Sequence, residues 1–553
     1  MQKYHRHAST RQRPQSQPIP GKNMKKNAAG GYAFKMDDWG RLDRFLILGA
    51  EGGTYYASEA KLTRDNAAAV MRCIEDDGPA VVRRIVEISR SGRAPKQDPA
   101  IFALALCAGA GLDKIGPGSK SDPGRPCRKA AADALPLVCR TGTALFHFAE
   151  YAQAFRGWGR LLRAAAARWY NDKPAERLAY QLAKYQGRDG WTNRDVLRLA
   201  HAKPQDPAHA LAYGWAAGKL SDPPDNLPAI HAMLQARELK TAREMAAHIA
   251  LHRLPRECVP TEWLDHPAVW EALLEDMPLT AMIRNLATMT RVKLLAPYAS
   301  ATKLVIERLN DAELLHHSRV HPIGILMALR TYAAGRGIRG HHTWEPLALI
   351  ADALNDAFYK AFTNVPPTGK RLLIAVDVSG SMDSGEVAGC IGLTPRIAAA
   401  AQALVFARSE PNCYIHAFSG VFEELPITPG ERLNDVICTT ETMSRRMTRT
   451  DCSVPIVYAR DQGWDVDAFV IITDSETWAG EIHPVQALAG YRRKRVAAAK
   501  LAVVAMTSGG FSIADPEDGG MLDVVGFDAA VPQLVRDFIA DQPEPQIPDD
   551  DVA

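Results

Sequence analysis

The chain has 553 residues, too many for one compact core, so we expect two or three domains. Hydrophobic residues make up 47% of it and charged residues 23%, as in ordinary globular proteins, and no apolar run is long enough to span a membrane. The net charge of +3 neither favours nor excludes a nucleic-acid partner. The nine cysteines occur singly, which excludes a zinc ribbon and a disulfide framework and indicates reduced thiols in a cytoplasmic protein.

The two ends of the chain differ from the rest in charge. Residues 1–30 contain seven lysines and arginines and no acid, whereas residues 541–553 are acidic and rich in proline. Such segments bury too little apolar surface to fold, so we expect a basic disordered tail over 1–30 and an acidic tail over 541–553. The basic tail is either a solubilising segment or an arm that contacts phosphates, and charge alone favours the first.

Residues 31–365 have the pattern of a helical-repeat domain. Apolar residues recur at helical spacing in stretches such as PAIFALALCAGAG and GTALFHFAEYAQAF, and Gly, Pro or Asp separates one stretch from the next. Alternation of β-branched residues is nearly absent. Many medium-length helices with short connections predict an α-solenoid of stacked helix pairs, and the lack of a strict period means that its repeats are degenerate.

The pattern changes after Pro366 and Pro367. The apolar runs RLLIAV, YIHAF, AFVIIT and KLAVVAM have the length of strands, and stretches of helical spacing separate them. Apolar strands that alternate with helices are typical of a parallel sheet covered on both faces. We therefore predict a doubly wound α/β domain over residues 366–540, whose ligands bind at the carboxyl ends of the strands.

Oxygen-bearing side chains follow two of these strands. Asp377, Ser379 and Ser381 come directly after the first strand, Asp474 follows AFVIIT, and Thr450 lies between them. Hard divalent cations such as Mg²⁺ bind oxygen sets of this kind, so these residues are candidate metal ligands. The alternatives are a chance match and a phosphotransferase with Asp377 as nucleophile. The second is disfavoured because Ser379 stands where such an enzyme carries a second acid, and no phosphate-binding loop is present.

Basic and aromatic residues in two helical segments are candidates for contacts with nucleic acid. One segment contributes Lys184, Arg188, Arg194, His201 and Lys203, and the other contributes Trp158, Arg160 and Arg163. Lys184 and Arg188 are four residues apart, so they share a face if the helix continues that far. The simpler explanation is a solvated helix face with tryptophans in the core. Clusters of this sort can also neutralise phosphates and stack on unpaired bases.

The stretches DVSGSM (377–382), TDC (450–452) and TDSETWAG (473–480) together resemble the metal-ion-dependent adhesion site of a von Willebrand factor A domain. The resemblance implies a set of metal ligands: Ser379, Ser381 and Thr450 directly, with Asp377 and Asp474 acting through water. The expected ion is Mg²⁺, with one open position for a ligand oxygen. Arg449 stands where the related sequences carry glycine, which leaves Thr448 as an alternative to Thr450.

Further stretches resemble the Ro 60 kDa autoantigen family. They are GWGRLLRAAAARWYNDKP (157–174), GWTNRDVLRLAHAKP (190–204), VPTEWL (259–264) and VHPIGILMALRTYAAGRGIRG (320–340), among others spread over nearly the whole chain. The resemblance implies a ring of HEAT-like helical repeats, the TROVE module, that the A domain closes.

The same resemblance implies a non-enzymatic RNA-binding protein. Such a protein binds Y RNA on the outer surface of the ring and passes single-stranded 3′ ends of misfolded RNA through the central hole. It acts in RNA quality control and decay, with an exoribonuclease such as polynucleotide phosphorylase as a partner. The role in Y RNA binding is carried over to Lys184, Arg188 and His201. We expect a cytoplasmic monomer without a membrane partner.

Two other functions remain as alternatives. The first is a metal-dependent protein-interaction scaffold whose A domain binds an acidic partner. The second is a metal-dependent nuclease or phosphatase, which ranks last because the sequence offers one metal position and no evident general base.

Overall fold

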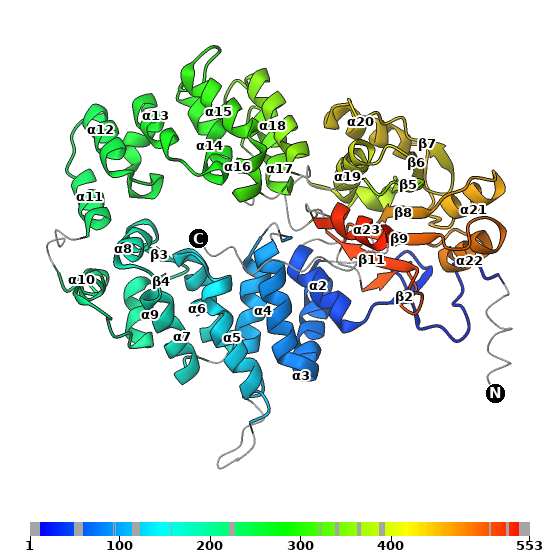
Figure 1. The fold of residues 1–553 in the computed structure, drawn as a ribbon, viewed down its shortest axis with the longest axis horizontal. Helices are drawn as coiled ribbons and strands as arrows, with labels where there is room; N and C mark the ends of the chain where they lie inside the picture. The colour runs from blue at the N-terminus through cyan, green and yellow to red at the C-terminus, as the bar shows by residue number, and fades with distance from the viewer. Residues whose placement is uncertain are drawn as a thin grey trace.

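The computed structural model describes residues 12–48, 59–91, 93–94, 96–112, 122–155, 157–220, 227–318, 320, 322–337, 342–361, 367–385, 387, 393–507, 510–526 and 530–540. These residues form a ring of helices and an α/β domain, as the sequence predicts. Figure 1 shows the helices following one another round the ring, with the α/β domain between the first helices and the last. None of the described helices is long and apolar enough to cross a bilayer.

The ring consists of helices that pack on other helices one to three places away in the chain. The first half comprises α2 (Asp38–Leu48), α3 (Glu59–Ser91), α4 (Asp98–Gly109), α5 (Arg125–Val138), α6 (Gly142–Phe155), α7 (Arg160–Asn171), α8 (Ala175–Lys184), α9 (Asn193–Ala200) and α10 (Pro207–Ala216). The second half comprises α11 (Pro228–Ala236), α12 (Ala242–His252), α13 (Pro267–Glu275), α14 (Leu279–Arg291), α15 (Ser300–Asn310), α16 (Ala312–His317), α17 (Pro322–Ala333) and α18 (Ala348–Lys360). Pairs such as α2 with α3, α12 with α13 and α17 with α18 are in contact, which confirms the predicted solenoid of helix pairs.

Local sequence sets where these helices begin. Thr192 before α9 and Thr241 before α12 each form a capping box with an acid three residues later. Several other helices, including α10 and α13, carry proline in the first turn, where its missing N–H costs no hydrogen bond.

The α/β domain contains a six-stranded sheet with the order β11-β9-β8-β5-β6-β7. Its strands are β5 (Leu372–Asp377), β6 (Cys413–Phe418), β7 (Phe422–Glu424), β8 (Ala468–Thr473), β9 (Lys500–Ala505) and β11 (Met521–Val525). Its helices are α19 (Pro395–Ser409), α20 (Leu433–Ser444), α21 (Val454–Asp461), α22 (Pro484–Lys494) and α23 (Ala530–Ala540). All neighbouring strands are parallel except β7, an antiparallel edge strand that the sequence does not predict.

Helices cover both faces of this sheet, so its central strands are buried throughout. Alternate residues of β5 belong to two different hydrophobic clusters: Ile374 packs in the cluster shared with the ring, and Leu373 packs with Leu488 of α22. Burial on both faces explains why these strands have continuous apolar sequences.

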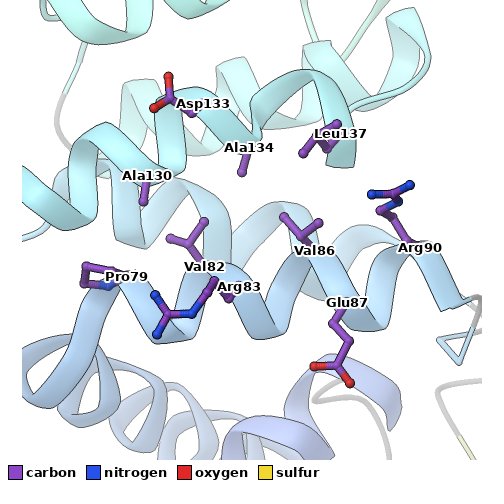
Figure 2. A pocket seen from close by; sticks show the side chains of 10 residues that line it. All are labelled: Pro79, Val82, Arg83, Val86, Glu87, Arg90, Ala130, Asp133, Ala134 and Leu137. Atoms are coloured by element: carbon purple, nitrogen blue, oxygen red, sulfur yellow. The ribbon is translucent and has the colours of Figure 1, made fainter. Parts of the chain in front are cut away.

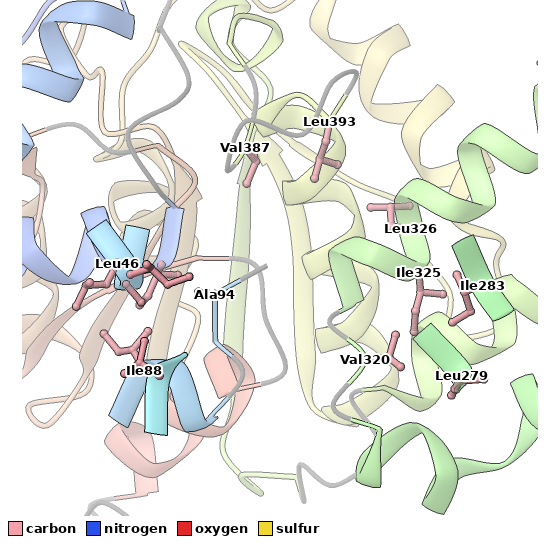
Figure 3. Packing of buried hydrophobic residues seen from close by; sticks show 14 of the residues in the cluster. Leu46, Ile88, Ala94, Leu279, Ile283, Val320, Ile325, Leu326, Val387 and Leu393 are labelled. Carbon is pink, nitrogen blue, oxygen red and sulfur yellow. The ribbon is translucent and has the colours of Figure 1, made fainter. Parts of the chain in front are cut away.

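Both ends of the ring contact the α/β domain. The buried guanidinium of Arg44 on α2 donates to the Asp523 carboxylate on β11 at 2.9 and 3.2 Å. At the other end, the Arg408 guanidinium of α19 lies 3.4 Å from the ring centroid of Tyr359 on α18. One hydrophobic cluster extends through both junctions, and Figure 3 shows its residues on α2 and α3, on α14 and α17, and in the α/β domain between them. The ring is therefore closed by packing as well as by polar contacts.

The first described residues form an N-terminal strap, defined here as residues 12–35, against the α/β domain. Its strands β1 (Met24–Lys26) and β2 (Tyr32–Lys35) form a small antiparallel sheet with β10 (Phe511–Ser512). Gln15 is fully buried. The predicted disordered tail is therefore wrong for residues 12–30, because polar groups of the strap hydrogen-bond to distant loops, a source of order that composition does not reveal. Residues 1–11 and the predicted acidic tail at 541–553 lie outside the described residues.

Candidate functional site

The predicted metal-binding residues lie at the carboxyl edge of the sheet. β5 and β8 are parallel neighbours with Val376 opposite Ile472, so Asp377 and Asp474 follow at the same edge. Asp377 is fixed on both oxygens: Thr473 Oγ1 donates to Oδ2 at 2.6 Å, and the backbone N–H of Ser379 donates to Oδ1 at 2.9 Å. The expectation that two strand-terminal acids meet at one edge is thus confirmed.

The hydroxyls of Ser379 and Ser381 complete this edge. Both side chains are buried, and their Oγ atoms are 3.1 Å apart; Ser379 precedes a short 3₁₀ helix, Gly380–Asp383, and Ser381 lies in its first turn. Asp474 accepts a hydrogen bond from the backbone N–H of Glu476 at 2.9 Å on Oδ1. Its Oδ2 is buried without a hydrogen-bond partner in the described chain. The edge therefore holds an unused carboxylate oxygen together with two converging hydroxyls.

Burial and mutual repulsion disfavour negative charge on these acids in the absence of a cation. Burial raises the pKa of Asp474 to about 7, and the nearby Asp377 contributes to the rise. Burial also raises the pKa of Asp377 and raises that of Glu476 to about 8, the latter with a contribution from Asp474. A divalent cation would remove this penalty, and carboxylate and hydroxyl oxygens are its preferred ligands.

The residues therefore fit a hard divalent ion such as Mg²⁺. Among the described residues, no group of three or more His, Cys, Asp or Glu side chains could hold a metal, so a site here must rely on hydroxyl oxygens.

Thr450 lies in a loop that hydrogen-bonds to the loop after β8 and to the loop after β6. Its carbonyl accepts hydrogen bonds from the backbone N–H groups of Trp478 and Ala479, each at 3.0 Å. The next residue, Asp451, donates its N–H to the Ser419 carbonyl at 2.9 Å, beyond the end of β6. Thr450 is buried whereas Thr448 is exposed, so the structure places the first of these two candidates at the sheet edge.

Arg449 is accommodated by a glycine on the adjacent loop. A Cβ atom at Gly420 would lie 2.9 Å from the Cβ of Arg449, closer than side chains normally approach. The side chain that replaces glycine at 449 thus occupies space that Gly420 leaves open, and the Thr450 backbone keeps its contacts with Trp478.

Sequence reasoning missed several polar residues of this edge. The hydroxyls of Ser419 and Ser475 are buried without a hydrogen-bond partner among the described residues, and both are further candidates for contact with an ion or its water. Arg396 of α19 holds the Ser379 turn: Nη2 donates to the Ser379 carbonyl at 3.1 Å and to the Asp383 carboxylate at 2.6 Å. Only the proximity of Ser419 and Ser475 to strand ends could have signalled them in the sequence.

The first basic segment has a different backbone from the predicted one. Helix α8 ends at Lys184, and Arg188 lies in a two-strand hairpin of β3 (Gly187–Arg188) and β4 (Trp191–Thr192). The condition for Lys184 and Arg188 to share a helix face, that the helix continues as far as Arg188, is therefore not met. Asp189 and Gly190 both have positive φ, of 52° and 78°, and Asp-Gly is a strong hairpin-turn signal that could have predicted this.

The cationic side chains of this segment are nonetheless accessible. Arg188, Arg194, His201 and Lys203 are exposed, and the Lys184 ammonium lies 5.5 Å from the ring centroid of Tyr185. Within the described chain, the one acid within 4 Å of these groups is Asp189, 3.7 Å from Arg188. His201 ends α9 in a left-handed conformation, with φ of 49°. Figure 1 shows α8, β3, β4 and α9 in one sector of the ring.

Trp158 joins the second segment to the first. It is half-buried and packs against Trp191, with ring centroids 6.0 Å apart, and its indole N–H is buried without a partner among the described residues. Arg160 is exposed at the start of α7, and Arg163 one turn later is half-buried. The structure thus brings the two tryptophans together. The position of Trp158 fits packing between side chains as well as it fits stacking on a base.

A separate groove lies between α3 and α5 and has a volume of about 490 Å³. It is lined by Pro79, Val82, Arg83, Val86, Glu87, Arg90, Ala130, Asp133, Ala134 and Leu137. Figure 2 shows the two valines of α3 facing Ala134 of α5, with the charged residues at the border. The floor is apolar and both arginines and acids border it, so the groove does not present the uniform positive charge of a polyanion site, and none of the predicted site residues lines it.

Comparison with known proteins places this architecture in a family. The family model described as the Ro60 vWA domain matches residues 371–539, and the model of the TROVE domain matches residues 25–222 and 252–331. The RNA-binding protein RO60 of Deinococcus radiodurans is 42% identical over 529 residues, which cover 95% of this chain and 97% of that protein. The chain belongs to the Ro60 family.

Two further comparisons agree with this assignment to Ro60. The RNA-binding protein RO60 of Caenorhabditis elegans is 37% identical over 581 residues, which cover 93% of this chain and 89% of that protein. The crystal structure of the Deinococcus radiodurans RO (RSR) protein superposes with a TM-score of 0.69 at 41% identity and covers 92% of this chain and 100% of that one. The Ro60 fold expected from the sequence, a TROVE ring followed by an A domain, is confirmed.

Proposed function

We propose that this protein is a cytoplasmic, non-enzymatic RNA-binding scaffold. It binds a Y-like small RNA through Lys184, Arg188 and His201 and takes single-stranded 3′ ends of misfolded RNA into the ring. It presents such RNA to an exoribonuclease for quality control or decay. The observation that carries this proposal is the cationic group at α8, β3 and the end of α9, in which Arg188 and His201 are exposed and Lys184 is half-buried; in the described chain it has one acidic neighbour. The names of the two RO60 relatives support RNA as the ligand.

The chemistry of this group suits a polyribonucleotide. Exposed lysine and arginine side chains release counterions when they neutralise phosphates, which gives affinity that falls with salt. His201 is exposed and can hydrogen-bond to RNA in its neutral form. Arg194 near the start of α9 and Lys203 after its end add further exposed cations, and Arg160 and the half-buried Arg163 add two more on α7.

We further propose a separate Mg²⁺ site in the A domain. Ser379, Ser381 and Thr450 would hold the ion, with Asp377 and Asp474 in support through water. When bound, the ion offers a coordination position to an oxygen of a carboxylate or phosphate ligand. Asp377 is already fixed by Thr473 and by the Ser379 backbone, so its part is to orient the Ser379 turn and to balance the ion's charge.

The test is to purify the native protein from its cells and to sequence the RNA that accompanies it. A small structured RNA, lost on replacement of Lys184, Arg188 and His201 by alanine but retained in Asp377→Ala, supports the RNA proposal and the separation of RNA binding from the A-domain edge. If no RNA travels with the protein and a Mg²⁺-dependent acidic protein does, the interaction-scaffold alternative holds instead. Equal loss of RNA from both variants contradicts the separation of the two sites.

A further inference from the structure

Gln15 of the N-terminal strap has an unusual position for an amide so early in the chain. It is fully buried in the A domain, and all of its hydrogen-bonding groups have partners. Its Nε2 donates to Asp451 Oδ1 at 2.7 Å and to the Ile482 carbonyl at 2.9 Å. Its Oε1 accepts from the Thr477 hydroxyl and from the Gly480 N–H. One side chain therefore connects two separate loops.

These two loops carry two residues of the proposed metal site, Thr450 and Asp474. Asp451 directly follows Thr450, and Thr477 lies three residues after Asp474. Gln15 is 436 residues from the first partner and 462 from the second. The contact is therefore purely tertiary. It adds a tie from outside both loops to the direct hydrogen bonds that the Trp478 and Ala479 N–H groups donate to the Thr450 carbonyl.

Other strap residues hold the Asp474 loop from the same side. Asn27 Nδ2 donates to the Thr477 carbonyl at 2.7 Å, and the Ala29 N–H donates to the Glu476 carboxylate at 2.9 Å. At Gly31 a Cβ atom would lie 2.0 Å from the Thr477 carbonyl oxygen, so only glycine permits the strap to approach this closely. The loop after β8 is thus enclosed by the strap on its outer side.

We infer that Gln15 is a positioning residue of the metal site, one that holds the Thr450 and Asp474 loops at the spacing a small divalent ion requires without touching the ion. This inference rests on the metal site proposed above. Mg²⁺ demands near-octahedral ligands at short distances, whereas Ca²⁺ accepts longer and more variable ones. Loss of the Gln15 contacts between the loops therefore lowers the affinity for Mg²⁺ more than the affinity for Ca²⁺.

The experiment measures Mg²⁺ and Ca²⁺ dissociation constants of the full-length protein by calorimetry. Gln15→Ala removes the tie, and we expect Mg²⁺ affinity to fall about tenfold, as for other residues that orient metal ligands, with a smaller loss for Ca²⁺. Gln15→Glu places a second carboxylate beside Asp451, so we expect a larger loss than with alanine. Gln17→Ala is the matched control, because Gln17 is exposed and, among the described residues, its side chain has one hydrogen bond, accepted from Arg13; its affinities stay native.

Two further variants separate positioning from stability. Val535→Ala destabilises the same domain from its core at α23, which packs on β9 and β11, and we expect it to leave the Mg²⁺-to-Ca²⁺ preference unchanged. Asn27→Ala loosens the strap at one point, and we expect a smaller loss of Mg²⁺ affinity than with Gln15→Ala. If Gln15→Ala unfolds the domain, Asn27→Ala decides the question.

Native Mg²⁺ affinity in the folded Gln15 and Asn27 variants, or an equal change in Mg²⁺ and Ca²⁺ affinity, overturns the inference while leaving the metal site in place. Failure of the native protein to bind Mg²⁺, or binding that survives Asp377→Ala, overturns the metal site and the inference together.

Discussion

The salt dependence of RNA binding gives the sharpest test of the basic surface. Replacing Lys184 and Arg188 by alanine removes two cations that the structure places in accessible positions, one at the end of α8 and one in β3. Each contact with a phosphate contributes about 0.7 to 0.9 to the slope of log K against log salt. The double variant should therefore reduce the magnitude of this slope by about 1.4 to 1.8, and at 0.1 M salt it should lose about 25- to 60-fold in affinity.

The assay is fluorescence anisotropy with a labelled stem-loop RNA that carries a single-stranded tail, between about 50 and 200 mM KCl. The matched control is Arg493→Ala with Lys494→Ala, which removes the same two residue types from the exposed end of α22 in the A domain. We expect the control to keep the native slope. An unchanged slope in the Lys184 and Arg188 variant, or an equal reduction in the control, would refute the assignment of these residues to phosphate contacts.

Three further predictions concern stability. Mg²⁺ at a hundred times its dissociation constant should raise the free energy of unfolding of the native protein by about 2.7 kcal/mol. Urea unfolding with and without Mg²⁺ measures this effect, which we expect to be absent in Asp377→Ala. Equal stabilisation of the native protein and the variant argues against the site. Arg44→Ala should cost about 3 to 5 kcal/mol because it leaves Asp523 without its buried partner at the ring junction; a cost near zero in the same assay would mean that packing alone closes the ring. Burial lowers the pKa of His483, whose Nε2 contacts the Gln17 carbonyl in the strap. The unfolded state then binds this proton at higher pH than the folded state, so stability is full above about pH 6.5 and falls as the pH drops below it. His483→Gln should flatten this part of the curve, and an unaltered pH profile would contradict the assignment.

The A-domain edge was predictable because its signals are local. The apolar runs of β5 and β8 identify buried parallel strands, and parallel strands present their carboxyl ends at one edge, which places Asp377 and Asp474 together. That these residues bind a metal remains a prediction. The hairpin that separates Lys184 from Arg188 was also encoded locally, in Asp189-Gly190, but helical spacing on either side concealed it.

The strap was not predictable, because its order comes from partners far away in the chain. Gln15 and Asn27 are polar residues in a basic segment, and composition indicates disorder for such a sequence. Each is buried because loops more than 430 residues away supply its hydrogen-bond partners. The same holds for Arg44, whose partner Asp523 is 479 residues away.

This chain order has a consequence for synthesis on the ribosome. Asn27 leaves the ribosome 450 residues before Thr477, and at about 5 to 20 residues per second it waits roughly 20 to 90 s for that partner. The TROVE helices can pack on one another during this interval, because each contacts helices close to it in the chain, such as α4 with α6 and α5 with α7. The nascent protein is therefore an open arc throughout elongation. The ring closes only after β11, the last strand of the A domain, has emerged and Asp523 can contact Arg44.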